Sequence, residues 1–326
     1  MKVLFIGGTG VISSACSALA LERGIELYLL NRGTSIRPAP EKAKILIADF
    51  NDPVAVKKVL GSHHFDAVVD WIAFRPEQID SAIQLFRSIT SQFIFISSAS
   101  AYQTPPAHLP VTESTILDNP YWEYSRNKIA CEERLVRAYR DEKFPFTIVR
   151  PSHTYDRTLL PFEGHWTVVD RMRQGKPVIV HGDGTSLWTL THHKDFARGF
   201  IGLLGNPQAI SEAVHITSDE WLNWNQIFEI VGHAAGVEPK LVHVPSEVIN
   251  KFDPEWGAGL LGDKSISMIF DNSKIKCLVP GFHAEIPFAL GAAEIIAWFD
   301  ADPARKSIDP KFNRLCEKIL ADYQKV

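Results

Sequence analysis

Several residue patterns are scarce or missing in this chain of 326 residues, and each absence excludes a class of protein. The four cysteines, Cys16, Cys131, Cys277 and Cys316, show no CxxC or Cys/His spacing, which argues against a zinc site or a disulfide framework. No apolar run approaches the roughly 20 residues that span a bilayer, and Met1 leads straight into a strand pattern. We therefore expect a cytoplasmic protein with reduced thiols, no metal ion and no membrane contact.

An excess of charge of one sign is also missing. The formal net charge is −4, which gives no general attraction for nucleic acid or for an anionic membrane. Hydrophobic residues make up 45% of the chain, enough to bury a substantial core. We expect the partner to be a small molecule rather than nucleic acid.

In the first half of the chain, short apolar runs alternate with amphipathic stretches. This alternation is typical of an α/β protein whose parallel sheet is covered by helices on both faces. The predicted strands are Val3 to Ile6, Glu26 to Leu30, Lys44 to Ala48, Ala67 to Trp71, Phe93 to Ser97 and Phe146 to Val149. The predicted helices are Val11 to Arg23, Pro53 to Leu60, Pro76 to Ser88 and Pro120 to Glu142. Six strands in this order predict a doubly wound Rossmann sheet.

After Arg150 the alternation stops, which indicates a second part of the molecule. Proline, glycine, histidine and aromatic residues dominate 151–184, with a predicted helix at Trp166 to Arg173 and a short strand at Val178 to Val180. We assign residues 1–160 and about 188–215 to the dinucleotide-binding domain. A smaller C-terminal substrate-binding lobe takes about 161–187 and 216–326.

A glycine-rich turn joins the first strand to the first helix. It reads Gly7, Gly8, Thr9, Gly10, Val11, Ile12, Ser13. Glycines allow a sharp turn and a close backbone approach, and the helix N-terminus offers free amides and a partial positive charge. This position in a strand–turn–helix unit predicts a pyrophosphate site; the alternative is a simple tight turn.

The ends of the second and third strands bear on the choice of dinucleotide. An acidic residue after the second strand binds a ribose 2′-hydroxyl, whereas a basic one accommodates a 2′-phosphate. Asn31 and Arg32 stand there, so NAD(P) is expected with a lean to NADP, although Arg32 could be a surface residue. Asp49 and Phe50 could hold the adenine, unless Asp49 caps the next helix.

Tyr124 and Lys128 are one turn apart on a predicted helix and so share a face. At about 4 Å and an effective dielectric near 20, a nearby ammonium favours the phenolate by roughly 4 kcal/mol. The spacing therefore predicts that Lys128 lowers the pKa of Tyr124, making it an acid/base for proton transfer. Lys128 would also bind the nicotinamide ribose.

Hydroxyl side chains follow the fifth predicted strand, whose carboxyl end opens onto the cofactor crevice. A serine there can hydrogen-bond the reacting oxygen while charge develops on it. Ser98 is the chosen candidate, and Ser97 and Ser100 compete with it.

With these residues in place, the chain resembles the extended and atypical short-chain dehydrogenase/reductase superfamily, of the NAD-dependent epimerase/dehydratase type. The motifs that carry the resemblance are the glycine turn, Asp49, Ser98, Tyr124 with Lys128, the segment 149–155, Gly182-Asp183-Gly184 and the segment 192–197. The resemblance implies Tyr124 as acid/base, Lys128 as its electrostatic partner and Ser98 as the substrate contact. It also implies that Trp71, Ile72 and Ala73 line the cofactor, that Pro151, Ser152 and His153 lie near the nicotinamide, and that the protein is a homodimer.

Two departures from that family bear on the substrate. Trp188 stands where nucleotide-sugar members place a diphosphate-binding arginine, and Ala99 and Ser100 stand where 4,6-dehydratases carry an Asp-Glu pair. A nucleotide-sugar substrate and dehydration are therefore both disfavoured. Candidates for an aromatic and imidazole substrate pocket are Trp122, Trp166, Trp188, Trp221, Trp224, His153, His165 and His192, each of which could instead belong to the core.

Two functions remain open on this evidence. The first is an NAD(P)-dependent oxidoreductase that acts at a secondary alcohol or ketone of a sugar-like substrate, as an epimerase or as a dehydrogenase/reductase. The second is a non-catalytic dinucleotide-binding or RNA-binding relative. Ser98, Tyr124 and Lys128 favour the enzyme.

Overall fold

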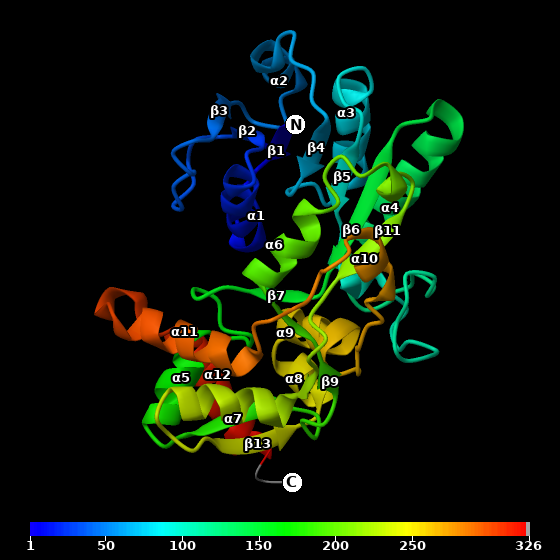
Figure 1. The fold of residues 1–326 in the computed structure, drawn as a ribbon. Coiled ribbons are helices and arrows are strands. Elements are labelled where there is room, and N and C mark those ends of the chain that lie inside the picture. The colour runs from blue at the N-terminus through cyan, green and yellow to red at the C-terminus, as the bar shows by residue number, and fades with distance from the viewer. Residues whose placement is uncertain (324–326) are drawn as a thin grey trace.

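The computed structural model describes residues 1–323, which form a Rossmann-type sheet region and a smaller lobe (Figure 1). One sheet of seven parallel strands runs in the order β11-β6-β5-β4-β1-β2-β3. The strand order reverses between β1 and β4, and this switch point creates the crevice expected of a doubly wound fold. The predicted fold class is confirmed.

The elements have the following bounds. The strands are β1 Lys2–Ile6, β2 Glu26–Asn31, β3 Lys44–Ile47, β4 Ala67–Asp70, β5 Phe93–Ile96, β6 Phe146–Pro151, β7 His153–Tyr155, β8 Pro177–His181, β9 Leu187–Trp188, β10 Leu190–His192, β11 Ala213–Ile216, β12 Leu222–Asn223 and β13 Lys240–Val244. The helices are α1 Val11–Glu22, α2 Pro53–Leu60, α3 Pro76–Phe86, α4 Glu123–Glu142, α5 Trp166–Arg173, α6 His193–Ile201, α7 Trp224–Ala234, α8 Ser246–Phe252, α9 Pro254–Gly259, α10 Ser273–Leu278, α11 Phe288–Asp300 and α12 Pro310–Tyr323. Short helical turns lie at η1 Ala99–Ala101, η2 Pro207–Ala209, η3 Leu260–Lys264 and η4 Pro303–Arg305.

Helices cover both faces of the central sheet. Buried side chains of α2, α3 and α4 pack with β-strand residues such as Leu4 and Phe93 on one face. Those of α1 and α6 pack with residues such as Phe5 and Ile94 on the other. Because neighbouring strand residues alternate between the two clusters, each strand is apolar on both sides, as its sequence indicated.

The predicted boundaries need three corrections. The sheet gains a seventh strand, β11, which pairs with β6. Helix α4 starts at Glu123 rather than Pro120, because the Asn119 side chain accepts the backbone amides of Tyr121 and Trp122 and holds a turn there. Part of the segment that was assigned to the smaller lobe also packs against the sheet, because Ile275 of α10 lies in the sheet core beside α6.

The lobe has its own core. It contains α5, α7, α11 and α12, with the parallel pair β8 and β13, seen below the sheet in Figure 1. Trp166 and Trp224 are buried in this core, at 4% and 1% exposure. The same cluster also includes Ala99, Tyr102 and Tyr155 from the first 160 residues, so the lobe packs directly against the end of the sheet region.

No helix in residues 1–323 is long and apolar enough to cross a membrane. The four cysteines are free thiols, of which Cys277 alone is exposed. The described residues contain no cluster of three or more His, Cys, Asp or Glu side chains that could hold a metal ion.

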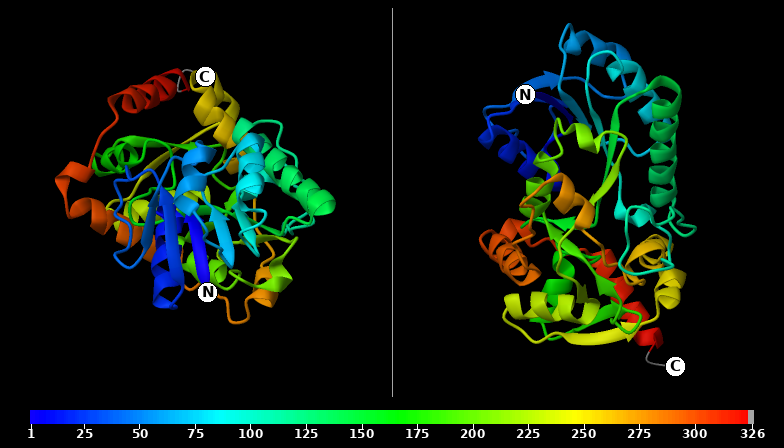
Figure 2. Two further views of the ribbon diagram at one scale, coloured as in Figure 1. Left: turned by 90° about the horizontal axis from the view of Figure 1, so that it is seen from above. Right: turned by 45° about the vertical axis from the view of Figure 1, so that its right-hand side comes forward.

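A buried ionic clamp ties α4 to the sheet, along whose flank the helix runs (Figure 2, right). The Glu132 carboxylate of α4 accepts from the Ser97 hydroxyl at 2.5 Å and from Nε and Nη2 of Arg150 at 3.0 and 2.5 Å. Arg150 also lies over the Tyr102 ring, 4.8 Å from its centroid. Glu132 and Arg150 are 2% and 4% exposed. The clamp therefore joins the helix to the ends of β5 and β6 without solvent.

We expect Glu132→Ala to lower the free energy of unfolding by about 3–5 kcal/mol, because it leaves Arg150 as an unpaired buried charge. Urea unfolding followed by circular dichroism measures the change. The matched control is Asp80→Ala, which removes the partner of Arg134 in an ion pair between α3 and α4, where Asp80 is 47% exposed. That surface pair should contribute about 0–1 kcal/mol, so equal losses in the two variants would contradict the role of the clamp.

Candidate active site

A cleft of about 530 Å³ opens at the carboxyl ends of β1, β2 and β3. Its lining combines the glycine turn with the residues that follow each strand. They are Gly7, Thr9, Gly10, Leu30, Asn31, Arg32, Gly33, Thr34, Ser35, Ala48, Asp49, Phe50, Asn51, Ile72, Phe74 and Gln78. This is the position at which open α/β sheets bind ligands.

The glycine turn has the shape of a phosphate cradle. Gly7 and Gly8 have φ of +97° and +105°, which side chains rarely adopt. A Cβ at Gly8 would lie 2.6 Å from Cδ2 of Leu29. The amide of Gly10 donates to Ser13 Oγ at 2.7 Å, and no acidic residue occupies the first turn of α1. A backbone turn beside an unopposed helix N-terminus suits a dinucleotide pyrophosphate.

The end of β2 carries no carboxylate into the cleft. Asn31 Oδ1 accepts the amide of Gly33 at 2.9 Å, and Arg32 is exposed. Across the cleft, Asp49 Oδ1 accepts from Asn51, while the N-cap of α2 is Asp52. The capping alternative for Asp49 is thus wrong, and Asp49 lines the cleft instead.

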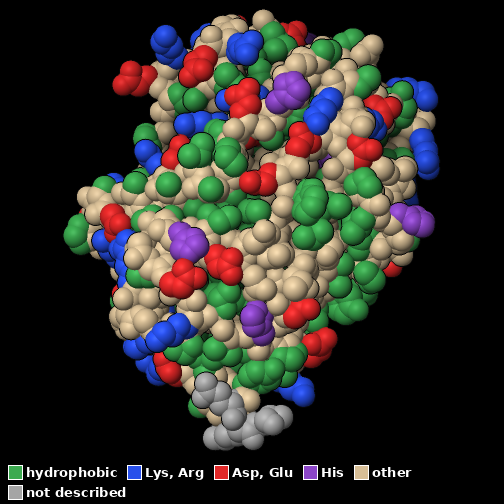
Figure 3. Space-filling model, turned by 60° about the horizontal axis from the view of Figure 1, so that its bottom comes forward, with side chains coloured by type: hydrophobic (Ala, Val, Ile, Leu, Met, Phe, Trp, Pro, Cys, Tyr) green, Lys and Arg blue, Asp and Glu red, His purple; other side chains and the backbone are tan. Residues whose placement is uncertain are grey.

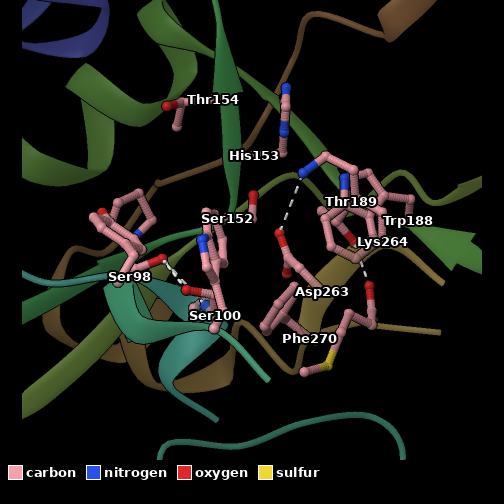
Figure 4. Close-up of a pocket in the computed structure, with 15 residues that line it drawn as sticks. Ser98, Ser100, Ser152, His153, Thr154, Trp188, Thr189, Asp263, Lys264 and Phe270 are labelled. Atoms are coloured by element: carbon pink, nitrogen blue, oxygen red, sulfur yellow. Dashed lines mark hydrogen bonds and ion pairs between the residues drawn. The ribbon is translucent and has the colours of Figure 1, made fainter. Parts of the chain in front are cut away.

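A second cavity, of about 320 Å³, lies between the sheet and the lobe (Figure 4). It is mainly apolar and aromatic, with a few polar groups. Its lining is Ser98, Ala99, Ser100, Trp122, Tyr124, Pro151, Ser152, His153, Thr154, Trp188, Thr189, Asp263, Lys264, Met268 and Phe270. The structure thus brings Ser98, Tyr124, His153 and Trp188 to one cavity.

Ser98 is held by a chain of hydroxyls. Its Oγ lies 2.9 Å from Ser100 Oγ, a contact marked in Figure 4, and accepts the Ser100 amide at 3.2 Å. Ser125 of α4 donates its hydroxyl to Ser100 Oγ at 2.8 Å. Either hydroxyl of this pair can be the donor; when Ser100 donates to Ser98, the hydroxyl hydrogen of Ser98 is left for another acceptor, such as the Tyr124 oxygen or a substrate oxygen.

Tyr124 lies on the cavity wall and is 37% exposed. Desolvation raises the pKa of its phenol, interaction with the Ser98 hydroxyl opposes that shift, and the Asp263 charge adds to it. The expected net lowering of this pKa is therefore wrong in this structure, because desolvation is the largest effect and raises the pKa. Tyr124 is a neutral phenol at neutral pH, which is a proton donor.

Lys128 is buried, at 5% exposure, between two strand ends. Its Nζ donates to the carbonyl oxygens of Ala73 at 2.7 Å and Ile96 at 2.8 Å. It lies 5.7 Å from the centroid of the Tyr124 ring. Burial lowers the pKa of Lys128 to about 8, against the opposing effect of Asp70. Two carbonyls thus hold the ammonium in place below the tyrosine.

Several predicted residues lie outside both cavities. Ser97 is committed to Glu132, Gly8 packs against Leu29, and the Trp71 indole lies in the sheet core 4.8 Å from the Phe200 centroid. Ala73 contributes only its carbonyl, and neither Val11 nor Ile12 lines the cleft.

Most of the tryptophan and histidine residues proposed for a substrate pocket also lie elsewhere, either in the core of the lobe, at a helix cap or on the surface. Trp166 and Trp224 fill the lobe core, Trp221 and His165 are exposed, and His192 caps α6 and contacts Glu294. Only Trp122, Trp188 and His153 line the cavity. Burial lowers the pKa of His153 to about 3, so its imidazole is neutral and no proton donor.

Sequence reasoning missed Asp263 and Lys264, which enter the cavity from the η3 turn. Asp263 Oδ2 and Lys264 Nζ lie 3.7 Å apart, as marked in Figure 4. Burial raises the pKa of Asp263 to about 6, against the opposing effect of Lys264. The motif Gly262-Asp263-Lys264 was a visible signal, but nothing local connects it to Tyr124.

Comparison with known proteins gives the class to which this fold and site belong. The model of the "NAD dependent epimerase/dehydratase family" matches residues 3–217. The structure of UDP-glucuronic acid 4-epimerase from Bacillus cereus, solved with UDP-glucuronic acid and NAD, matches 92% of this chain and 99% of that one, with a TM-score of 0.74 and 18% identity.

Two curated relatives are similar in sequence. The 2′-dehydrokanamycin reductase of Streptomyces kanamyceticus is 26% identical over 86% of this chain and 80% of its own. The chloroplast stem-loop binding protein of 41 kDa b of Arabidopsis thaliana is 26% identical over 74% of this chain and 65% of its own. The chain belongs to the NAD-dependent epimerase/dehydratase family, as the resemblance predicted, and is an enzyme of that family.

The glycine turn generates the first binding prediction. We expect Gly8→Ala to weaken the binding of NAD and NADP by about tenfold or more, because its Cβ would overlap Leu29 Cδ2. Isothermal titration calorimetry measures both dissociation constants.

Gly24→Ala is the matched control, since Gly24 has φ of +74° but nothing within 4 Å of an added Cβ. It reproduces the backbone strain without the overlap. Equal weakening by both variants would contradict the assigned role of the turn.

Proposed function

We propose that the protein is an NADP-preferring oxidoreductase that reduces a ketone to a secondary alcohol on a sugar-like substrate. The observation that carries the proposal is that Ser98 and Tyr124 line the wall of the same cavity. Desolvation raises the pKa of the Tyr124 phenol, in keeping with a protonated side chain. A ketone that gains hydride needs one proton, and a neutral phenol can supply it. The similarity to a reductase over most of both chains supports this direction.

The residues of the cleft fit a dinucleotide. Gly7 and Gly10 would hold its pyrophosphate, Asn31 and Arg32 its adenosine ribose, and Asp49 its adenine. When bound, the dinucleotide supplies the hydride. Lys128 would bind the second ribose, and Pro151 to His153, which line the second cavity, would lie beside the nicotinamide.

Side chains of the protein itself supply the proton. Ser98 donates its free hydroxyl hydrogen to the substrate oxygen and holds it next to the Tyr124 phenol. Tyr124 releases its proton to that oxygen as negative charge develops there. Lys128 stabilises the phenolate that remains, because its charge is buried and screened little by solvent.

The cavity suits a sugar-like ring rather than a nucleotide sugar. Trp122 and Trp188 offer aromatic faces, and Asp263 offers a carboxylate for hydroxyl or ammonium groups. Among the described lining residues, Lys264 is the one cationic side chain, and Asp263 already neutralises it. A diphosphate would therefore find no unpaired cation there.

The alternative function is RNA binding, which the similarity to a stem-loop binding protein suggests, and it has less support. The net charge is −4, and the face shown in Figure 3 mixes acidic and basic side chains with hydrophobic ones. RNA-binding surfaces gather positive charge of one sign. We propose a cytoplasmic homodimer with a small-molecule substrate.

We expect Tyr124→Phe to lower kcat for ketone reduction by about 10²–10⁴-fold, because the proton donor is lost while the ring remains. The assay follows oxidation of NADPH with a panel of keto sugars and keto glycosides that lack a diphosphate. Dinucleotide affinity should stay unchanged. Interconversion of UDP-sugars by the wild-type protein without net consumption of NADPH would show an epimerase and overturn the proposal.

Arg32 tests the cofactor preference. We expect Arg32→Ala to weaken NADP about tenfold or more, because a charged hydrogen bond contributes about 1.5–3 kcal/mol, and to leave NAD unaffected. Arg23→Ala makes the same change of charge at the far end of α1 and serves as the control. Equal losses for NAD and NADP in Arg32→Ala would remove the preference.

A further inference from the structure

Asp70 is a fully buried carboxyl group at the end of β4, with 0% exposure. Its Oδ1 accepts the backbone amides of Ile72 and Ala73, both at 2.9 Å. Its Oδ2 has no hydrogen-bond partner among the described residues. A buried carboxyl that is only half satisfied is costly, so its presence calls for an explanation.

The turn that Asp70 folds leads directly to Lys128. The two hydrogen bonds from these backbone amides fix the chain from Trp71 to Ala73. The carbonyl of Ala73 then accepts from Lys128 Nζ at 2.7 Å. The second carbonyl on Lys128 comes from Ile96 of β5. An ammonium has three donors, and these two acceptors carry no formal charge.

Asp70 is the remaining counter-charge for Lys128, because the other titratable groups around Lys128 are neutral or already paired. On α4, Glu132 is taken by Arg150, and burial raises the pKa of the Cys131 thiol to about 12, so the thiol is neutral. Tyr124 is neutral as well. On β4, burial raises the pKa of Asp70, while the two amides and the Lys128 charge oppose that shift. The interaction of Asp70 with Lys128 is thus attractive and sits in a region without solvent.

We propose that Asp70 is a positioning residue that orders the carbonyl on which Lys128 rests and keeps Lys128 charged beside Tyr124. Asp70 acts through Lys128 and touches neither cavity. Its kinetic consequence rests on the proposed function, whereas its electrostatic effect on Lys128 does not. A neutral residue at this position would leave a buried ammonium between two carbonyls, where desolvation favours loss of its proton.

The first test measures the charge of Lys128 in the free protein. Asp70→Asn keeps an oxygen that can accept the turn amides but removes the charge. In ¹⁵N-lysine-labelled protein, with Lys128→Met used to assign the signal, the Nζ resonance should titrate near pH 8 in the wild type. In Asp70→Asn the midpoint should fall by about one pH unit. An unchanged midpoint would overturn the proposal, whatever reaction the enzyme catalyses.

The second test is the pH profile of kcat/KM for ketone reduction. Activity that needs charged Lys128 falls as pH rises through its pKa, so this fall should occur at lower pH in Asp70→Asn, with recovery toward wild type under acidic conditions. The control is Asp66→Asn, an exposed carboxyl just before β4, which should not move the profile.

A loss of activity in Asp70→Asn that is uniform at every pH would show a merely structural role and would overturn the proposal. If Asp70→Asn does not fold, Asp70→Ser takes its place, since a hydroxyl can also accept turn amides. If no ketone is reduced by the wild type, the proposed function fails, and the resonance of Lys128 still decides the role of Asp70.

Discussion

The ion pair between Glu132 and Arg150 is the interaction on which the geometry of the site depends. Helix α4 carries Tyr124 and Lys128, whereas Ser98 follows β5 and Pro151 ends β6. These residues meet only if the helix keeps its rotation and its position along the sheet. Apolar packing alone tolerates small slides, but a carboxylate that accepts from Ser97 and Arg150 at once does not. A shift of the helix that separated these two groups would leave each as an unpaired buried charge, which makes the alternatives to this arrangement unfavourable.

The position of Lys128 follows from that constraint and explains why simple Coulomb reasoning gave the wrong direction for Tyr124. The sequence placed a lysine one turn from the tyrosine, and a pair at about 4 Å would favour the phenolate. In the fold, the Lys128 side chain points toward the strand ends and donates hydrogen bonds to the carbonyl oxygens of Ala73 and Ile96. Tyr124 is partly desolvated and feels the charge of Asp263, and both effects raise the pKa of its phenol.

Much of the sheet and half of the site could be predicted because their signals are local. The alternating apolar runs gave six of the seven strands, and Gly7 to Gly10 and Tyr124 with Lys128 are short motifs within single units. Asp263 and Lys264 could not be placed, since they reach the cavity through the packing of a lobe whose chain order gives no such signal. Trp221, His165 and His192 failed as candidates for the opposite reason: residue type cannot tell a pocket wall from a cap or a surface.

The pairing of Asp263 with Lys264 in the cavity supports the proposal of a substrate without a diphosphate more strongly than Trp188 does on its own. A diphosphate needs cations that are free to bind it, and the lining lysine already has a carboxylate 3.7 Å away. Breaking that pair to admit a dianion would bury Asp263 beside added negative charge, which is unfavourable in an aromatic cavity. A neutral or amino-bearing ring has no such cost, because its donors can join Asp263 while Trp122 and Trp188 cover its apolar surfaces. The electrostatics of the pocket therefore support the proposal of a substrate without phosphate, even though the fold is shared.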